Sequence, residues 1–253
     1  MTGGELLEET KRRFIQLLKF QGDGVYRREL QSEVVISRPL SVAEAIGDPG
    51  RDDFPIIRGR EVLMQATFKG VAGQAFTAAS GDFQGTLGDV LALPLDENFE
   101  RAVFIATMNA ALRYLGKIEK TVHCRDDGPK RCSSLAVDWL RDQEWEMVGL
   151  MGLQPAILEA LVKAFGRERV MVSDLAEAGS ERCGVRVLDG LNSEEIFEQC
   201  QLILITGSTI VNGTIDDLLD RAAEHDRRVV LFGVTIAGAA YLMGLESWCA
   251  CST

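Results

Sequence analysis

The segment LILITGSTIVNGTIDDLL (residues 202–219) decides the fold that we expect for this chain. Residues 202–205 are apolar, which is the pattern of a short strand buried on both faces of a parallel sheet. The polar residues 207–213 predict a loop, and Thr214 predicts the N-cap of a helix with Asp217 as its reciprocal capping partner. Ligands of parallel sheets bind outside the carboxyl ends of the strands. This loop is therefore the first candidate for a ligand site.

The loop of residues 207–213 carries groups that suit an anion. Hydroxyl groups, one side-chain amide and the backbone amides at the start of the next helix can donate hydrogen bonds to an anionic ligand. The candidate ligand-binding residues are Gly207, Ser208, Thr209, Asn212 and Thr214. The same residue types are ordinary turn and capping residues, so a purely structural loop is the alternative.

The composition restricts the class of protein. The chain has 253 residues, of which 46% are hydrophobic and 26% charged, enough for two modest domains or one large one. The net charge of -11 and the lack of a basic cluster argue against a nucleic-acid partner. The sequence has no apolar run of about 18 residues and begins with a polar stretch, so we expect no membrane span, no signal peptide and a cytoplasmic location. The six cysteines should then be reduced thiols.

The N-terminal part of the chain predicts an α+β unit. Residues 5–20 place apolar side chains at helical spacing, and residues 26–37 and 61–77 have the composition of strands in a small antiparallel sheet. Residues 99–115 are apolar nearly all round, so they predict a helix at the centre of this unit. Strands and helices that do not alternate regularly predict an α+β domain, here ending near residue 120.

Strands and helices alternate from about residue 145 onward, which predicts a Rossmann-like domain with a mainly parallel sheet. The expected strands are residues 147–150, 170–172, 185–188, 202–205 and 228–232. Asp174 follows the second of these strands, where such folds place an acid for a ribose hydroxyl. The turn between Gly149 and Gly152 lacks the full glycine fingerprint of dinucleotide-binding proteins, which disfavours a dinucleotide.

The chain therefore divides into three predicted parts. Residues 1–120 form the α+β domain, residues 121–144 a junction of loop and helix, and residues 145–253 the α/β domain.

The junction contains TVHCRDDGPKRC (residues 121–132), which brings nitrogen, sulfur and oxygen donors onto one short segment. Such donors suit a thiophilic divalent metal ion, and their place between two domains predicts a site that is open to water or ligand. The candidate metal ligands are His123, Cys124, Asp126 and Cys132. Cysteines that only fill the core are the alternative. Cys249 and Cys251 add two thiols, either on one face of a strand or in a frayed tail.

Four motifs carry a resemblance to a known family. They are GQAFT (residues 73–77), NFERAVFIATMNAALRYLG (98–116), TVHCRDD (121–127) with the following Cys132, and ITGSTIVNGTIDDLL (205–219). With them, residues 5 to 247 resemble the putative heavy-metal chelation proteins. The resemblance implies a domain similar to the enolase N-terminal domain followed by a Rossmann-like domain. It also implies a ligand site in the cleft between them and a role in handling a metal or a metal cofactor.

The chain departs from this family in one loop. The family usually has a Gly-Pro-x-x-Pro pattern there, whereas this chain reads GVTIAG at residues 233–238. We therefore expect the wall that this loop forms to differ.

Three classes of function follow. The first is a protein that binds or delivers a metal ion, or a metal-containing or anionic small ligand, in the interdomain cleft. The second is an enzyme that acts on a nucleotide or an S-adenosylmethionine-like molecule. The third is a non-catalytic scaffold that binds a partner chain, and a homo-oligomer is compatible with each of them. Because the sequence has no clear nucleophile and base pair, it leaves open whether the protein is an enzyme.

Overall fold

Burial on both faces accounts for the short apolar strands of the C-terminal half. The structure, a computed structural model, describes residues 4–36, 39–59, 61–141 and 144–253. Within these residues one sheet has the strand order β11-β10-β9-β5-β6-β8-β7. Its strands are β5 (Val148–Met151), β6 (Val170–Asp174), β7 (Glu181–Arg182), β8 (Val185–Asp189), β9 (Leu202–Thr206), β10 (Arg228–Phe232) and β11 (Ser247–Trp248). All neighbours are parallel except β7 and β8, so the predicted mainly parallel sheet is confirmed.

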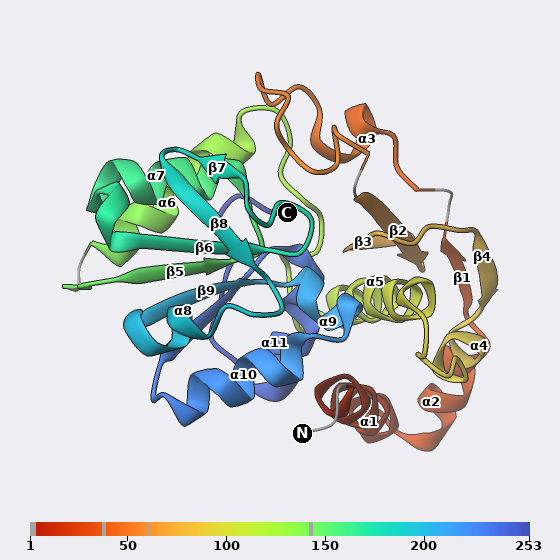
Figure 1. The fold of residues 1–253 in the computed structure, drawn as a ribbon. Helices are drawn as coiled ribbons and strands as arrows, with labels where there is room; N and C mark the ends of the chain where they lie inside the picture. The colour runs from red at the N-terminus through yellow and green to blue at the C-terminus, as the bar shows by residue number, and fades with distance from the viewer. Residues whose placement is uncertain (1–3, 37–38, 60, 142–143) are drawn as a thin grey trace.

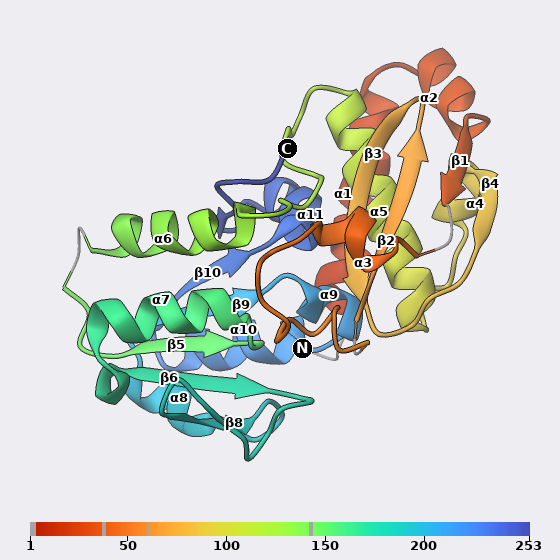
Figure 2. The same ribbon diagram turned by 90° about the horizontal axis from the view of Figure 1, so that it is seen from above.

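Helices cover both faces of this sheet (Figures 1 and 2). On one face lie α6 (Gly128–Leu140) and α7 (Pro155–Phe165), and on the other α8 (Glu194–Gln199), α10 (Ile215–Glu224) and α11 (Ala237–Met243). Leu202 and Leu204 belong to the core on the α6 and α7 side, whereas Ile203 and Ile205 belong to the core on the opposite side. Because both sets of side chains are removed from water on folding, each of these four residues contributes buried apolar surface.

The N-terminal half forms an antiparallel sheet of order β3-β2-β1-β4. Its strands are β1 (Glu33–Ile36), β2 (Val62–Phe68), β3 (Val71–Thr77) and β4 (Phe83–Thr86). The long helix α5 (Asn98–Tyr114) packs against β2 and β3 and lies between the two sheets (Figure 1). Residues 102–112 of α5 are all buried, as its apolar sequence predicts. The remaining helices of this half are α1 (Glu5–Phe20), α2 (Asp23–Leu30), α3 (Val42–Ile46) and α4 (Leu87–Leu91).

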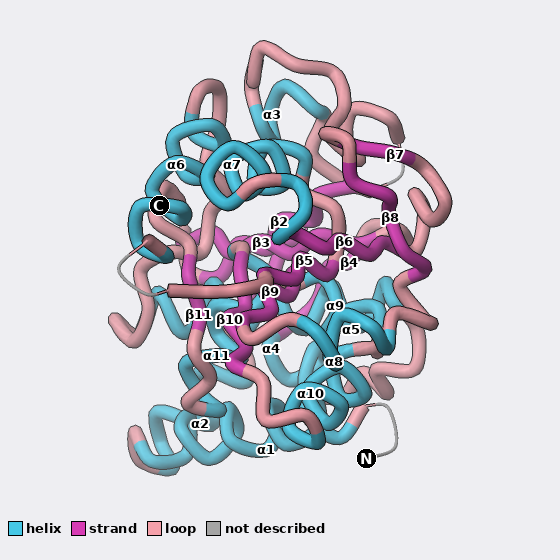
Figure 3. Tube along the Cα trace, turned by 60° about the vertical axis from the view of Figure 1, so that its left-hand side comes forward, coloured by secondary structure: helices cyan, strands magenta, loops and turns pink. Residues whose placement is uncertain are grey.

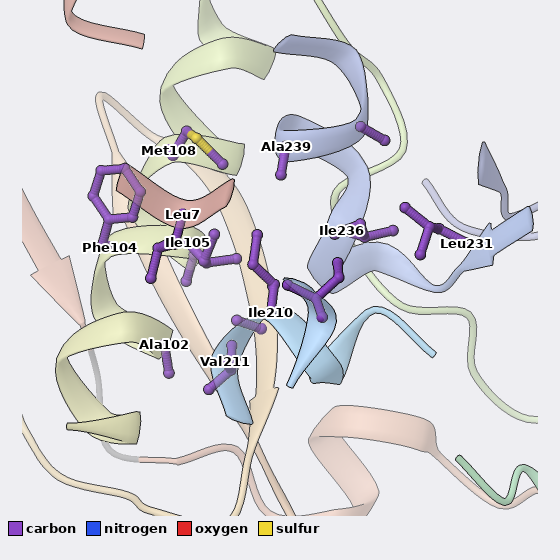
Figure 4. Packing of buried hydrophobic residues seen from close by; sticks show 14 of the residues in the cluster. Leu7, Ala102, Phe104, Ile105, Met108, Ile210, Val211, Leu231, Ile236 and Ala239 are labelled. Carbon is purple, nitrogen blue, oxygen red and sulfur yellow. The ribbon is translucent and has the colours of Figure 1, made fainter. Parts of the chain in front are cut away.

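One hydrophobic core joins the two halves. It includes Phe14 and Phe104 from the N-terminal half and Ile210 and Ile236 from the C-terminal half. Figure 4 shows side chains of α5 beside those of α9 (Ser208–Asn212) and of the segment from the 3-10 helix η2 (Val234–Ile236) into α11. In the C-terminal half the strands lie between α6 and α7 above and α10 and α11 below (Figure 3). None of the helices in the described ranges is long and apolar enough to cross a membrane.

Two local predictions were wrong. Residues 26–30 belong to helix α2 rather than to a strand, because this segment is rich in Arg and Glu, and Glu29 is buried in an ion pair with Lys69. Residues 208–212 form the short helix α9 rather than a loop, because Ile210 and Val211 are buried in the shared core.

The predicted capping box at Thr214 is also wrong. The Thr214 side chain makes no capping hydrogen bond, and the neighbouring Asp216 carboxylate instead accepts hydrogen bonds of 2.8 Å from the backbone amides of Gly4 and Leu6. Asp217 pairs with Arg221 one helical turn later. The first turn of α10 thus binds the start of α1, a contact between distant parts of the chain that local capping rules do not address.

Candidate functional site

A cavity of about 400 Å³ lies at the carboxyl ends of the parallel strands. The chain passes from β5 through β6 to β8 on one side and then returns to β9 on the other side of β5. The cavity is lined by the ends of β5 and β9 on both sides of this reversal, where ligands of open α/β sheets bind. Ile56, Glu61 and Phe76 from the N-terminal half complete its wall.

Both groups of predicted site residues meet at this cavity. The lining contains every predicted ligand-binding residue, together with three of the four predicted metal ligands: Gly207, Ser208, Thr209, Asn212, Thr214, Asp174, His123, Cys124 and Cys132. Asp126 does not line it. Segments that are separate in sequence therefore share one site, because each of them ends or begins at the same edge of the parallel sheet.

The start of α9 forms one wall of the cavity. The Gly207 amide donates to the Phe232 carbonyl at 2.8 Å, which holds this turn against the end of β10. The Thr209 hydroxyl donates to the Thr206 carbonyl at 2.7 Å, and the Ser208 hydroxyl lies 3.2 Å from that of Thr206. Two of the predicted anion-binding hydroxyls thus already have partners within the protein. This wall offers neutral polar groups rather than a cluster of free donors.

We predict that Asn212→Ala leaves the free energy of unfolding within about 1 kcal/mol of wild type. Within the described residues the Asn212 side chain makes no hydrogen bond, and it is partly exposed. Urea denaturation of the two proteins measures the difference. A variant that unfolds instead would identify Asn212 as a structural residue.

Asp174 fixes the turns that follow β5 and β6. One carboxylate oxygen accepts from the Leu153 amide at 2.8 Å, and the other from the Ala176 and Glu177 amides at 2.8 and 3.1 Å. The sequence predicted this carboxylate as a partner for a ribose hydroxyl. In the structure it lies on the cavity wall, but its oxygens already serve three backbone donors.

Three thiols meet on the wall of the cavity near β11. Cys124 precedes α6, Cys132 lies within it, and Cys249 follows β11. The thiols of Cys124 and Cys249 both hydrogen-bond to the sulfur of Cys132, as do the backbone amides of Ala250 and Cys251. These bonds lower the pKa of Cys132 and raise the pKa of Cys124 and of Cys249. Cys132 is therefore the thiol of the three that most readily becomes a thiolate.

Cys249 was not among the metal ligands predicted from the sequence. Its position depends on the C-terminal segment, which pairs with the junction: the Val122 amide donates to the Thr253 carbonyl at 2.7 Å, and the Thr253 amide donates to the Val122 carbonyl at 3.0 Å. The Cys-Ala-Cys motif at residues 249–251 was the feature of the sequence that could have indicated this ligand. Only this pairing shows that its first thiol reaches Cys132.

His123 presents a partly exposed imidazole to the same cavity. Its Nδ1 is buried and has no hydrogen-bond partner, and its ring meets the Phe76 ring edge to face with centroids 5.2 Å apart. Burial lowers the pKa of His123, so the ring is neutral near pH 7 and keeps a lone pair on one nitrogen. The backbone amide of His123 donates to Gln74 Oε1 at 2.7 Å, which holds the junction on β3.

Asp126 has a different role from the other predicted metal ligands. Its carboxylate accepts a hydrogen bond from the Asp48 amide at 3.0 Å, and its own amide donates to the Ile46 carbonyl at 2.8 Å. These hydrogen bonds hold the loop after α3. Asp126 does not line the cavity wall on which the thiols lie. Within the described ranges, no group of three or more His, Cys, Asp or Glu residues is arranged to hold a metal ion. The four predicted donors thus do not form a closed set.

The charge of the cavity wall is one-sided. Among its described lining residues there is no Lys and no Arg, whereas Glu61, Asp174 and Glu177 contribute carboxylates. Much of the remaining wall is apolar, with Phe54, Phe76 and Phe232 among the aromatic contributors. On the described part of this wall an anion would meet no cationic side chain, so the electrostatics favour a cation or a neutral ligand.

Comparisons with known proteins agree with the resemblance in the sequence. The family model described as "DUF364: Putative heavy-metal chelation" matches residues 135–244. A solved DUF364 protein of unknown function from Pyrococcus horikoshii aligns with a TM-score of 0.56 and 16% identity, over 91% of this chain and 79% of that chain. A second one, from Desulfitobacterium hafniense, aligns with a TM-score of 0.48 and 16% identity, over 72% of this chain and 73% of that chain. No curated protein matches the chain.

The first structural alignment shows a shared fold. Together with the match of the family model, it confirms the resemblance: over residues 135–244 this chain is a match to the DUF364 family, which is named for heavy-metal chelation.

Proposed function

We propose that the protein binds a thiophilic metal cation in the cavity, at an open site that serves sequestration or transfer. The observation that carries this proposal is the contact of the Cys132 sulfur with both Cys124 and Cys249 on a cavity wall without Lys or Arg. Thiolates prefer soft and borderline ions, and a bound cation would replace the protons that now link the three sulfurs. The name of the matching family supports the same class of ligand.

Two donor groups on the cavity wall suit such an ion. Cys132 supplies a thiolate, and the neutral imidazole of His123 has a buried nitrogen without a partner. A structural zinc site would instead show four closed protein ligands. Because fewer donors converge here, water or the bound molecule would fill the remaining positions. An open site of this kind permits release of the ion, which a closed structural site opposes.

The sequence suggested an anionic ligand as an alternative to the metal, and the cavity favours the cation. The α9 wall, with Ser208, Thr209 and Asn212, has neutral side chains. We infer that it contacts water or a neutral polar part of the bound species.

We predict that Cys124→Ser with Cys132→Ser weakens cobalt(II) binding by about 100-fold or more, because hydroxyls are poor ligands for a borderline ion. Cobalt(II) is titrated into reduced protein under anaerobic conditions, and thiolate-to-cobalt absorption in the near ultraviolet is recorded. Wild type should bind it stoichiometrically with this absorption. Cys183→Ser is the matched control, because Cys183 is exposed and does not line the cavity.

Equal cobalt binding by wild type and the double variant would reject the thiol site. It would support the other hypothesis, in which these cysteines only fill the core.

A second candidate function is an enzyme that acts on a nucleotide or an S-adenosylmethionine-like molecule. Numbered along the chain from β5, the parallel strands follow the order 3-2-1-4-5-6 of the Rossmann fold, and Asp174 ends the second strand. A thermal shift with adenosine or S-adenosylmethionine, but not with cobalt(II), would favour this function over metal binding.

We also propose the finer division of the fold that the sequence predicted. In it, an α+β domain similar to the enolase N-terminal domain covers residues 1–120, a junction covers 121–144, and a Rossmann-like domain covers 145–253. The antiparallel sheet before residue 120 and the strand order after residue 145 support it. The cytoplasmic location expected from the sequence would keep the thiols reduced.

A further inference from the structure

A second polar region of the cavity lies where β6 ends. Ser173 and Asp174 come from the end of β6, and Glu61 comes from the segment before β2. β10, β9 and β5 separate β6 from β11, which carries the Cys249 end of the cavity, so the strands are roughly 19 Å apart at the usual spacing. This region is therefore distinct from the thiols.

Two polar groups in this region have no partner. The Ser173 side chain is 1% exposed, and its hydroxyl makes no hydrogen bond. Within the described residues, the Glu61 carboxyl forms neither a hydrogen bond nor an ion pair. Buried polar groups without partners are uncommon in folded proteins, since each loses its hydrogen bonds to water. Ser173 is such a group, and the partly exposed Glu61 adds a carboxylate without a partner among the described residues on the wall of the same cavity. Together they indicate a ligand that supplies the missing bonds.

The nearby arginines do not balance the charge of this region. Arg182 and Arg58 lie 2.6 and 3.8 Å from the two carboxylate oxygens of Glu177, so they neutralise Glu177. The Asp174 oxygens accept from backbone amides, which carry no net charge. Among the described residues, Glu61 and Asp174 thus place negative charge on the wall without a side-chain cation paired to them.

We propose that this region binds the primary ammonium group of a small molecule whose apolar part lies against the aromatic and aliphatic wall of the cavity. An ammonium carries three donors and one positive charge, which match the Glu61 carboxylate, the Ser173 hydroxyl and the field of Asp174. A divalent metal ion fits less well, because backbone amides already occupy the Asp174 oxygens. The site needs no contact with the thiols and goes beyond the proposed metal binding.

The proposal has a pH signature. Burial, together with the nearby charge of Asp174, raises the pKa of Glu61 to about 7. Among the described residues, the same cavity wall also carries Glu177, which is paired with Arg58 and Arg182. An alkylammonium stays protonated well above neutral pH, as lysine does with a pKa of about 10.4. Its binding should therefore strengthen as the pH rises from about 6 to about 8 and Glu61 ionises.

The test compares three probes of similar size by calorimetry: benzylamine, benzyl alcohol and benzoate. Wild type at pH 8 should bind benzylamine at least about 10-fold more tightly than benzyl alcohol, and benzoate should bind most weakly. Glu61→Gln should abolish the preference for the amine. Glu195→Gln, which removes a carboxylate from the exposed surface of α8, is the control and should retain it.

Stability measurements show whether Glu61→Gln is folded. Because the pKa of Glu61 is raised on folding, its ionisation destabilises the native state as the pH rises from about 4.5 through about 7. Glu61→Gln should therefore melt at a higher temperature than wild type at pH 8 and at a similar temperature at pH 4. Ser173→Ala is the second variant; it removes a hydroxyl without a protein partner and should weaken benzylamine binding while keeping the melting temperature.

Equal affinity of wild type for the three probes would overturn the proposal, as would a preference for the amine that survives in both variants. Cobalt(II) binding without benzylamine binding would reject the ammonium site alone. Benzylamine binding without cobalt(II) binding would reject the thiol site alone.

Discussion

Asn109→Ala should lower the free energy of unfolding by about 3 to 5 kcal/mol. The Asn109 amide is completely buried in α5 and donates to the carbonyls of Gln74 and Val234 at 3.1 Å. Its oxygen accepts from the Gly238 amide at 2.8 Å. Alanine would leave these backbone groups buried without partners, and each such group costs about 1 to 3 kcal/mol. One side chain thus connects β3 to the start of α11.

Urea denaturation of wild type and Asn109→Ala measures this loss, with Asn212→Ala as the matched control. Both changes remove the same amide, but only Asn109 has protein partners among the described residues. A loss below about 1 kcal/mol for Asn109→Ala would show that water replaces its hydrogen bonds. The contact between the two sheets would then not depend on this residue.

Gly73→Ala should destabilise the protein by about 3 kcal/mol or more, because the added methyl group meets backbone atoms that cannot rotate away. Gly73 lies within β3, where α5 crosses it. A Cβ atom there would lie 2.3 Å from the Ala110 nitrogen and 2.4 Å from the Ala106 oxygen. The helix would have to move away from the sheet and expose part of the core.

The control for this prediction is Gly24→Ala. Gly24 lies in α2, and a Cβ atom there would meet nothing within 4 Å. Alanine has the higher helix propensity, so Gly24→Ala should be neutral or stabilising by up to about 1 kcal/mol. Thermal and urea unfolding of both variants decide the matter. Equal stability of the two variants would mean that α5 does not rest directly on Gly73.

The period of the apolar residues made much of the fold predictable. The run of residues 202–205, followed by polar residues, predicted a strand of a parallel sheet, and β9 is an inner strand of that sheet, between β10 and β5. The apolar residues of α5 predicted a buried helix. These patterns are local, since each reflects which faces of a single element leave water.

Residues 26–30 and 207–214 show where local rules fail. The first segment is a helix that places Glu29 in an ion pair with Lys69, and the second is a helical turn held by burial of Ile210 and Val211. In both cases a distant part of the chain supplies the stabilising contact. Tertiary contacts of this kind outweigh propensities of a few tenths of a kcal/mol per residue.

The sequence by itself determined the identities of the candidate groups: the thiols and imidazole of the junction, the polar residues after β9 and the acid after β6. Only the tertiary structure decided which of them share a cavity. It brought Cys249 to Cys132 through the pairing of Val122 with Thr253, and it turned Asp126 toward Asp48. It also brought Glu61 and Asp174, which are far apart in the sequence, to the wall of the same cavity. The physical reason is that periodicity reports burial within one element, whereas a site is formed where the ends of several elements meet.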